Sequence, residues 1–215
     1  MENNNQVYSK MFTWLFIGLL VTFVTGYSLS QNVYLMANLL SVGIWPIFIV
    51  ELILAVVLST RIAKMNPITT KILYLIYSIT TGITFSAIFV VFKMSSIISI
   101  FLVTAIIFGV LAFYGYVTKR DLTKFGTILL VALLSMIIFS VINIIFIKSS
   151  TADLALTMIG ILVFAGYIAY DVNKVKYLMN SVGEEKAAVY GAFQLYLDFI
   201  NLFIRLLELF GKRND

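Results

Sequence analysis

The sequence predicts an all-α membrane protein with seven transmembrane helices. Hydrophobic residues make up 61% of the 215 residues and charged residues only 12%, and the mean hydropathy is +1.04, which is far from the composition of a soluble domain. The apolar residues form continuous runs long enough to cross about 30 Å of hydrocarbon as helices. A transmembrane barrel would instead show short segments of alternating hydrophobicity.

Seven apolar runs are expected to span the membrane, and only short connections separate them. They are Met11–Tyr27, Leu39–Thr60, Ile72–Phe92, Ile97–Val117, Phe125–Ile147, Leu154–Tyr170 and Ala187–Phe210. Pro46 lies within the second run, where a proline predicts a kink. No connection is long enough to hold a soluble domain, so residues 1–215 are expected to form a single seven-helix domain. Within it, residues 1–10 are expected to be a short cytoplasmic N-terminal segment.

The basic residues of the loops predict the orientation. The N-terminus and the alternate loops carry ten of them, and the opposite loops and the tail carry four. The first group is Lys10, Arg61, Lys64, Lys71, Lys119, Arg120, Lys124, Lys174, Lys176 and Lys186; the second is Lys93, Lys148, Lys212 and Arg213. Because cytoplasmic loops are enriched in Lys and Arg, the N-terminus is expected in the cytoplasm of a plasma (inner) membrane protein, and the C-terminus outside.

Composition also narrows the chemistry. The chain has no cysteine and no histidine, which removes disulfides, thiol nucleophiles and imidazole-based metal sites or triads. The net charge of +5 does not predict nucleic-acid binding, because the basic residues lie in separate short loops. Any chemistry must use carboxylates, hydroxyls, Lys and Arg side chains or backbone carbonyls. On the arguments below we expect no enzymatic activity and no cofactor, and we expect as partners ions, the lipid bilayer and, in one alternative, a membrane protease.

Two aspartates are the strongest functional candidates. Asp171 follows the sixth apolar run in Gly166-Tyr-Ile-Ala-Tyr-Asp-Val-Asn173, and Asp198 lies inside the seventh in Leu195-Tyr-Leu-Asp-Phe-Ile-Asn201. Each is expected to lack a neighbouring base that would make it an ordinary surface carboxylate. A carboxylate near the centre of a bilayer costs about 2.5–3.5 kcal/mol. A chain that keeps two of them on adjacent segments is therefore expected to use them.

The seventh run carries a polar stripe, because its polar residues recur at spacings of three and four. These residues are Gln194, Asp198, Asn201, Arg205 and Glu208. Such a helix is expected to lie at the centre of the others, with the stripe facing partners or a water-filled path. Arg205 and Glu208 can pair as i and i+3. Glu51 lies in the second run. It is expected either to line a pore or to form a buried hydrogen bond to a hydroxyl of a neighbouring helix.

Four segments together resemble the Bax inhibitor-1 family, also called the transmembrane Bax inhibitor motif family. They are the tail Leu195-Tyr-Leu-Asp-Phe-Ile-Asn-Leu-Phe203, the pair Tyr170-Asp171, the loop Tyr114-Gly-Tyr-Val-Thr-Lys-Arg-Asp-Leu122 and Thr81-Gly-Ile-Thr84. The resemblance covers nearly the whole chain. It implies seven helices with the last at the centre of two three-helix layers, and a pH-sensitive calcium leak.

The resemblance also assigns roles. It implies that Asp171 and Asp198 form the pH sensor and ion gate on the sixth and seventh helices, and that Arg61 is the countercharge that engages them. Physically, two carboxylates about 4 Å apart repel by about 4 kcal/mol at an effective dielectric near 20. They are expected to share one proton as a hydrogen-bonded clasp, and when fully ionised to offer hard oxygen ligands to Ca²⁺.

Two alternatives stay open. Some bacterial relatives resemble modulators of a membrane-anchored ATP-dependent protease, which they bind through a cytoplasmic N-terminus; Met1–Lys10 is polar enough to permit this role. Intramembrane aspartyl proteases also place one aspartate in a Tyr-Asp pair and another on the next helix. Those enzymes carry Gly-x-Gly-Asp and a later Pro-Ala-Leu, whereas this chain has Leu195-Tyr-Leu-Asp198 and no proline after Pro67, so proteolysis is the weaker reading.

Overall fold

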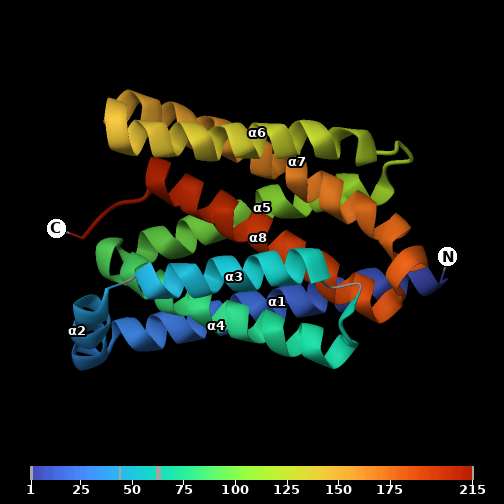
Figure 1. Ribbon diagram of the computed structural model, residues 1–215, viewed down its shortest axis with the longest axis horizontal. Coiled ribbons are helices and arrows are strands. Elements are labelled where there is room, and N and C mark those ends of the chain that lie inside the picture. Colours follow the sequence, from blue (N-terminus) through green and yellow to red (C-terminus); the bar gives the residue numbers. More distant parts are fainter. Residues whose placement is uncertain (1, 44, 62–63, 215) are drawn as a thin grey trace. The chain divides into compact units, whose positions relative to one another are not determined.

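The computed structural model describes residues 2–43, 45–61 and 64–214, and nearly all of them are helical (Figure 1). In chain order the helices are α1 (Glu2–Ser30), α2 (Val33–Val42), α3 (Trp45–Arg61), α4 (Pro67–Val91), α5 (Met94–Val117), α6 (Thr123–Ile142), a π-helical turn η2 (Asn143–Ile147), α7 (Ser150–Val182) and α8 (Glu184–Phe210). The predicted all-α fold class is confirmed.

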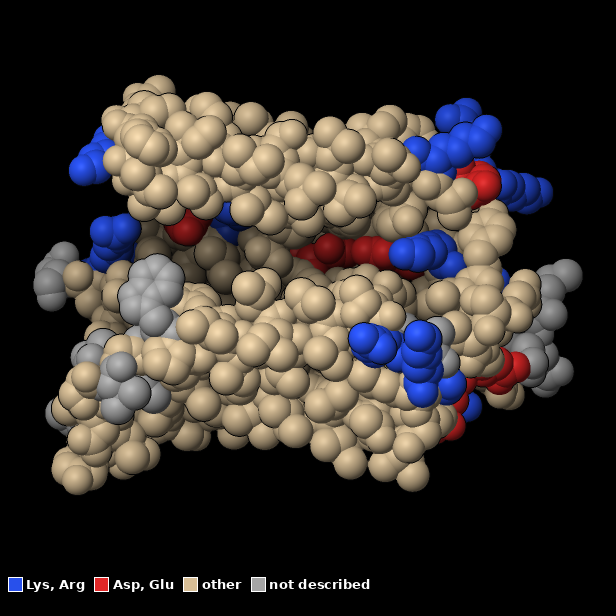
Figure 2. Space-filling view, viewed as in Figure 1, with Lys and Arg blue, Asp and Glu red and all other residues tan. Residues whose placement is uncertain are grey.

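Among the described residues, six helices are long and apolar enough to cross a membrane: α1, α4, α5, α6 with η2, α7 and α8. The sequence predicted seven spans. The difference lies in α3, which has 17 residues and is therefore about 26 Å long, slightly less than the hydrocarbon thickness. The outer surface of α6 shows the membrane pattern, because it is apolar along its length and basic side chains appear only toward its ends (Figure 2).

The second predicted span, Leu39–Thr60, is wrong in its boundaries. It is divided between α2 and α3, and Gly43 between them has φ +84°. A left-handed glycine ends a helix without steric cost, which the hydropathy of the run does not reveal. Pro46 does not kink a span. It lies in the first turn of α3, where no intrahelical N–H bond is lost.

The sixth predicted span, Leu154–Tyr170, is too short. Helix α7 continues to Val182, because buried apolar residues such as Val172 and Val175 extend its packed face beyond the apolar run. A single residue, Gly183 with φ +83°, separates α7 from α8. The predicted loop there does not exist. Its two acidic residues, Glu184 and Glu185, form the first turn of α8.

The N-terminal segment also differs from the expectation. Helix α1 begins at Glu2, so residues 2–10 continue the first predicted span as helix. Val7, Tyr8 and Met11 are buried. The segment is polar in composition, but its few apolar residues lie on one face of the helix, and that face is buried.

The chain divides into two compact units, which we describe separately. The first contains Met1–Met94, Leu178–Tyr196 and Arg213–Asp215, and the second contains Ser95–Tyr177 and Leu197–Lys212. By sequence, α8 contributes its first half to the first unit and its second half to the second unit.

The first unit is built on close packing of α1 against α4. An added Cβ at Gly82 would lie 2.6 Å from the Thr25 Cβ and 2.9 Å from the Thr22 carbonyl oxygen. Hydroxyls cross the same contact, since Thr22 Oγ1 donates to the Ser78 carbonyl at 2.9 Å and lies 2.5 Å from the Tyr196 hydroxyl. Small residues thus let two membrane helices approach closely enough for polar side chains to reach the opposite backbone.

The second unit joins α5, α6, α7 and the end of α8. An added Cβ at Gly115 would lie only 2.4 Å from the Ala169 carbonyl oxygen, so the backbones of α5 and α7 are in contact. Phe199 of α8 packs against Phe101 and Phe108 of α5, with ring centroids 5.2 and 5.5 Å away. These contacts fix the position of α8 immediately after Asp198.

The turn between α6 and α7 is closed by one buried side chain. Asn143 donates to the Ser149 carbonyl and accepts from the Ser149 amide, both at 3.1 Å. It also donates to Asp153 Oδ1 at 2.6 Å. Lys148 has φ +53° in this turn. The amide supplies the hydrogen bonds that the chain loses where the helix ends.

Gly82→Ala should destabilise the protein, because its Cβ would meet helix backbone that cannot move alone. We expect a loss of about 1–3 kcal/mol, the usual cost of overpacking, measured as a lower midpoint of thermal unfolding in detergent. Gly109→Ala is the matched control, since nothing lies within 4 Å of a Cβ there, and alanine favours a helix by about 1 kcal/mol over glycine. Equal midpoints for the two variants would contradict the proposed α1–α4 contact.

Candidate functional site

Asp171 of α7 and Asp198 of α8 meet inside the second unit. Their side chains are hydrogen-bonded to each other, and the residues are 6% and 5% exposed. Ionised carboxylates only accept hydrogen bonds, so a bond between two carboxyls requires a proton on one of them. The two carboxyls are therefore neighbours, and the hydrogen bond between them requires one shared proton.

One oxygen of this pair lacks a donor group. Asp198 Oδ2 is buried and its carboxyl is bonded to Asp171, but the described residues supply no N–H or hydroxyl to this oxygen. A buried carboxyl oxygen without a partner is costly. The proton shared with Asp171, a water or a cation would each satisfy it.

Two further residues of α7, Lys174 and Tyr167, interact electrostatically with the pair, and the sequence analysis gave neither of them a role at the site. Lys174, one turn after Asp171, is a cation whose charge acts on Asp171. Its ammonium also lies 5.3 Å from the centre of the Tyr170 ring. The charges of both aspartates act on Tyr167. The i, i+3 spacing of Asp171 and Lys174 was the signal that could have identified the cation, and the statement that Asp171 lacks a neighbouring base is wrong.

The predicted countercharge, Arg61, belongs to the other unit. It is an exposed residue in the last turn of α3, whereas the aspartate pair lies in the second unit. The electrostatic partner that the structure gives Asp171 is Lys174. The role of Arg61 therefore stays a prediction.

Glu51 follows the second of its two predicted readings. Its side chain accepts a hydrogen bond from Thr84 Oγ1 of α4 at 3.1 Å. Its charge also acts on Tyr77 and Tyr196, all within the first unit. A partly buried hydrogen bond to a hydroxyl on a neighbouring helix is thus observed, and a pore role for Glu51 is a separate prediction.

The polar stripe of α8 divides into local pairs. Gln194 donates to the Tyr190 hydroxyl at 2.7 Å, and Asn201 donates to the Leu197 carbonyl of its own helix at 2.8 Å. Arg205 and Glu208 form the expected ion pair, 3.7 Å apart. Apart from Asp198, these members of the stripe therefore have partners close to them in sequence.

Metal binding at this site would depend on few protein ligands. In the part of the chain that the structure describes, no group of three or more Asp, Glu, His or Cys residues lies together. The predicted ligands are the two aspartates alone. Because Ca²⁺ takes six to eight oxygen ligands, water or backbone carbonyls would have to supply the rest.

Asp121, in the loop before α6, has a structural role. Its Oδ1 accepts hydrogen bonds from the amide of Thr123 at 2.9 Å and from the Thr123 hydroxyl at 2.5 Å. These two bonds favour the ionised form and lower the pKa of Asp121 below its ordinary value. The side chain lies one residue before the N-cap, Leu122, and satisfies the amide of the first residue of α6.

Comparisons with known proteins identify the family. The family described as "Inhibitor of apoptosis-promoting Bax1" matches residues 4–215. The inner membrane protein YbhL of Escherichia coli K12 is 38% identical over 213 residues, which cover 95% of this chain and 91% of that protein. A Borreliella burgdorferi protein is 34% identical over 98% of this chain and 94% of its own length. A Streptococcus pyogenes membrane protein is 33% identical with the same coverage. With its paired aspartates on the last two helices and a match along nearly its whole length, the chain belongs to the Bax inhibitor-1 family.

Proposed function

We propose that this protein is a pH-sensitive calcium leak of the plasma membrane, gated by Asp171 and Asp198. The observation that carries the proposal is the buried, hydrogen-bonded carboxyl pair, to which the described residues supply no N–H or hydroxyl at Asp198 Oδ2. Membership of the family supports it, and YbhL is named as an inner membrane protein. The protein has no catalytic role in this proposal.

The pair would act as a latch, a contact that holds α7 and α8 together and that responds to both protons and cations. With one proton, the two carboxyls hold α7 and α8 together by a hydrogen bond. Without it, two buried charges repel by about 4 kcal/mol if about 4 Å apart at an effective dielectric near 20. A divalent cation between the carboxylates relieves that repulsion, so Ca²⁺ and H⁺ compete for the same oxygens. This competition is the source of the proposed pH dependence.

The membrane arrangement is part of the proposal. We infer that α3 is the seventh span, with tilt or local thinning of the bilayer compensating for its length. The N-terminus would then be cytoplasmic and the C-terminus outside. The central place of the last helix between two three-helix layers rests on the family resemblance and the polar stripe of α8.

The alternative role, binding of a membrane-anchored ATP-dependent protease through Met1–Lys10, stays a prediction. Residues 2–10 are helical, and Val7 and Tyr8 are buried. A partner would therefore have to bind the exposed side of the start of α1. Recovery of the protease with the purified protein would support this role, and loss of recovery on changing exposed α1 residues would locate it.

The proposal predicts that the two aspartates behave as one titrating unit. Asp171→Asn and Asp198→Asn should each alter the pH dependence of Ca²⁺ entry into proteoliposomes, followed from about pH 6 to about pH 8. The double variant should resemble either single variant rather than their sum, because the first substitution already removes the shared proton. Independent effects that add in the double variant would rule out the latch.

The same substitutions distinguish a leak from an aspartyl protease. A protease needs one carboxylate as base and the other as acid, so Asp198→Asn should abolish turnover of a membrane substrate. In a leak the asparagine keeps size and hydrogen bonding. We expect Ca²⁺ flux to persist with a changed pH dependence. The enzyme would be favoured if the unchanged protein cleaved the substrate, Asp198→Asn abolished this cleavage, and the unchanged protein showed no Ca²⁺ flux.

Lys174 should act on the latch more strongly than Arg61 if the structure identifies the relevant cation. Removing a neighbouring positive charge stabilises the protonated carboxyl, so Lys174→Gln should move the pH midpoint of the leak upward by about one unit. Arg61→Ala tests the predicted countercharge by the same measurement. A shift with Arg61→Ala alone would restore the sequence-based assignment, and normal expression of both variants is the control.

A further inference from the structure

A single buried amide joins α7 to the loop between α5 and α6. Asn173 is 1% exposed. Its Oδ1 accepts from the Leu122 amide at 3.2 Å, and its Nδ2 lies 3.3 Å from the carbonyl oxygens of Gly115 and Arg120. One side chain thus satisfies three backbone groups that the end of α5 and the start of α6 leave without helical partners.

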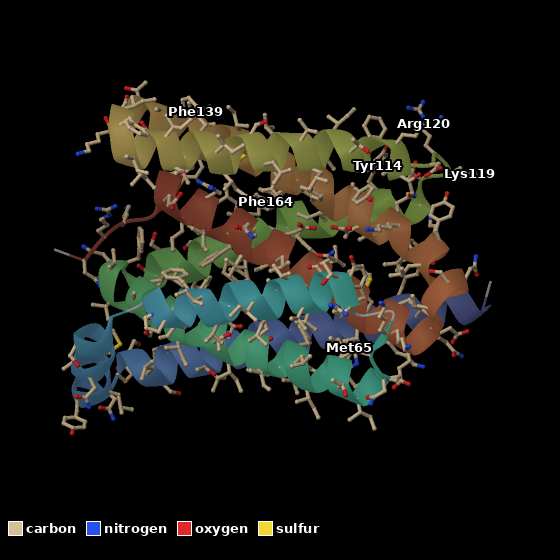
Figure 3. The ribbon with its side chains drawn as sticks, viewed as in Figure 1. Met65, Tyr114, Lys119, Arg120, Phe139 and Phe164 are labelled. Atoms are coloured by element: carbon tan, nitrogen blue, oxygen red, sulfur yellow. The ribbon has the colours of Figure 1, made fainter. Side chains whose placement is uncertain are left out.

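The loop is bound to α7 at a second point. Lys176 donates to the Thr118 carbonyl at 3.1 Å. Figure 3 labels Lys119 and Arg120 in this loop, which connects the end of α5 to the start of α6. The segment from Gly115 to Leu122 is therefore attached to α7 by side chains that lie two and five residues after Asp171.

The position of Asn173 on α7 relates it to the aspartate pair. Successive residues of a helix are about 100° apart, so Ala169 and Asn173 share one face, and Asp171 lies about 200° from each, on the opposite side. The first face contacts α5, because Gly115 lies against the Ala169 backbone. The opposite face presents Asp171 to Asp198 of α8.

We propose that Asn173 is a positioning residue of the Asp171–Asp198 pair. By fastening one face of α7 to the α5–α6 loop, it fixes the rotation at which the opposite face directs Asp171 at α8. Its effect on calcium rests on the proposed function, whereas its effect on the geometry of the pair does not. A rotation by one residue, about 100°, would direct Asp171 away from α8.

The chain has no cysteine, which permits a direct test of this geometry. In the full-length protein, Asp171→Cys and Asp198→Cys together supply one thiol pair, whose cross-linking rate with a short bifunctional thiol reagent reports the rotation of α7. Adding Asn173→Ala should lower that rate by about tenfold, the factor that corresponds to about 1.4 kcal/mol. An unchanged rate in a protein that remains folded and monodisperse would overturn the proposal.

Asn143→Ala is the matched control. Asn143 is also 1% exposed and also binds a turn through both amide atoms, but it serves the turn between α6 and α7. It should lower the thermal midpoint by a similar amount and leave the cross-linking rate unchanged. If both asparagine variants slow cross-linking equally, general loosening explains the result and the positioning role is wrong.

A second variant reaches the same face without touching Asn173. Gly115→Ala places a Cβ 2.4 Å from the Ala169 carbonyl oxygen, so it should displace α7 and also slow cross-linking. Slow cross-linking with Gly115→Ala but not with Asn173→Ala would transfer the role to the α5–α7 backbone contact and overturn the proposal for Asn173.

Calcium entry is measured separately, with the aspartate pair intact. Asn173→Ala should change the Ca²⁺ concentration that gives half-maximal flux by about tenfold, in parallel with the cross-linking rate. If no variant, including the unchanged protein, conducts Ca²⁺, the leak proposal fails while the cross-linking result still decides the role of Asn173.

Discussion

The hydrogen bond between the Asp171 and Asp198 carboxyls is the interaction on which the candidate site depends. It exists only while a proton is present, because two carboxylates have nothing to donate. It is buried, so water cannot replace it at low cost. The bond also requires that α7 be held at the rotation that directs Asp171 at α8.

The support for this bond is arranged on opposite faces of α7. One face contacts α5 so closely that Gly115 has no room for a side chain, and Asn173 fastens the adjoining loop. The other face carries Asp171. On α8, Phe199 follows Asp198 directly and packs on the rings of α5. Packing between rigid helices, rather than a flexible loop, therefore sets the separation of the carboxyls.

The sequence predicted much of this fold because hydropathy determines which segments can enter a bilayer. The helical class, most spans and both aspartates followed from that constraint. The errors concern features that hydropathy does not record. Gly43 and Gly183 end helices through backbone conformations that glycine adopts readily. The buried face of α7 continues past Tyr170, although the sequence there contains more polar residues. Asn173 was missed because its value comes from backbone groups more than fifty residues away in the chain.

The one-residue break at Gly183 sets a condition on chain length. Asp171 lies 12 residues before this glycine and Asp198 lies 15 residues after it, so the two carboxyls meet at the end of helical arms about 18 and 22 Å long. Inserting or deleting one residue in either arm would move its aspartate by about 1.5 Å along the axis and about 100° around it. Substitutions along this hairpin are therefore tolerated far more easily than insertions or deletions. Relatives that keep both aspartates should keep their spacing of 27 positions.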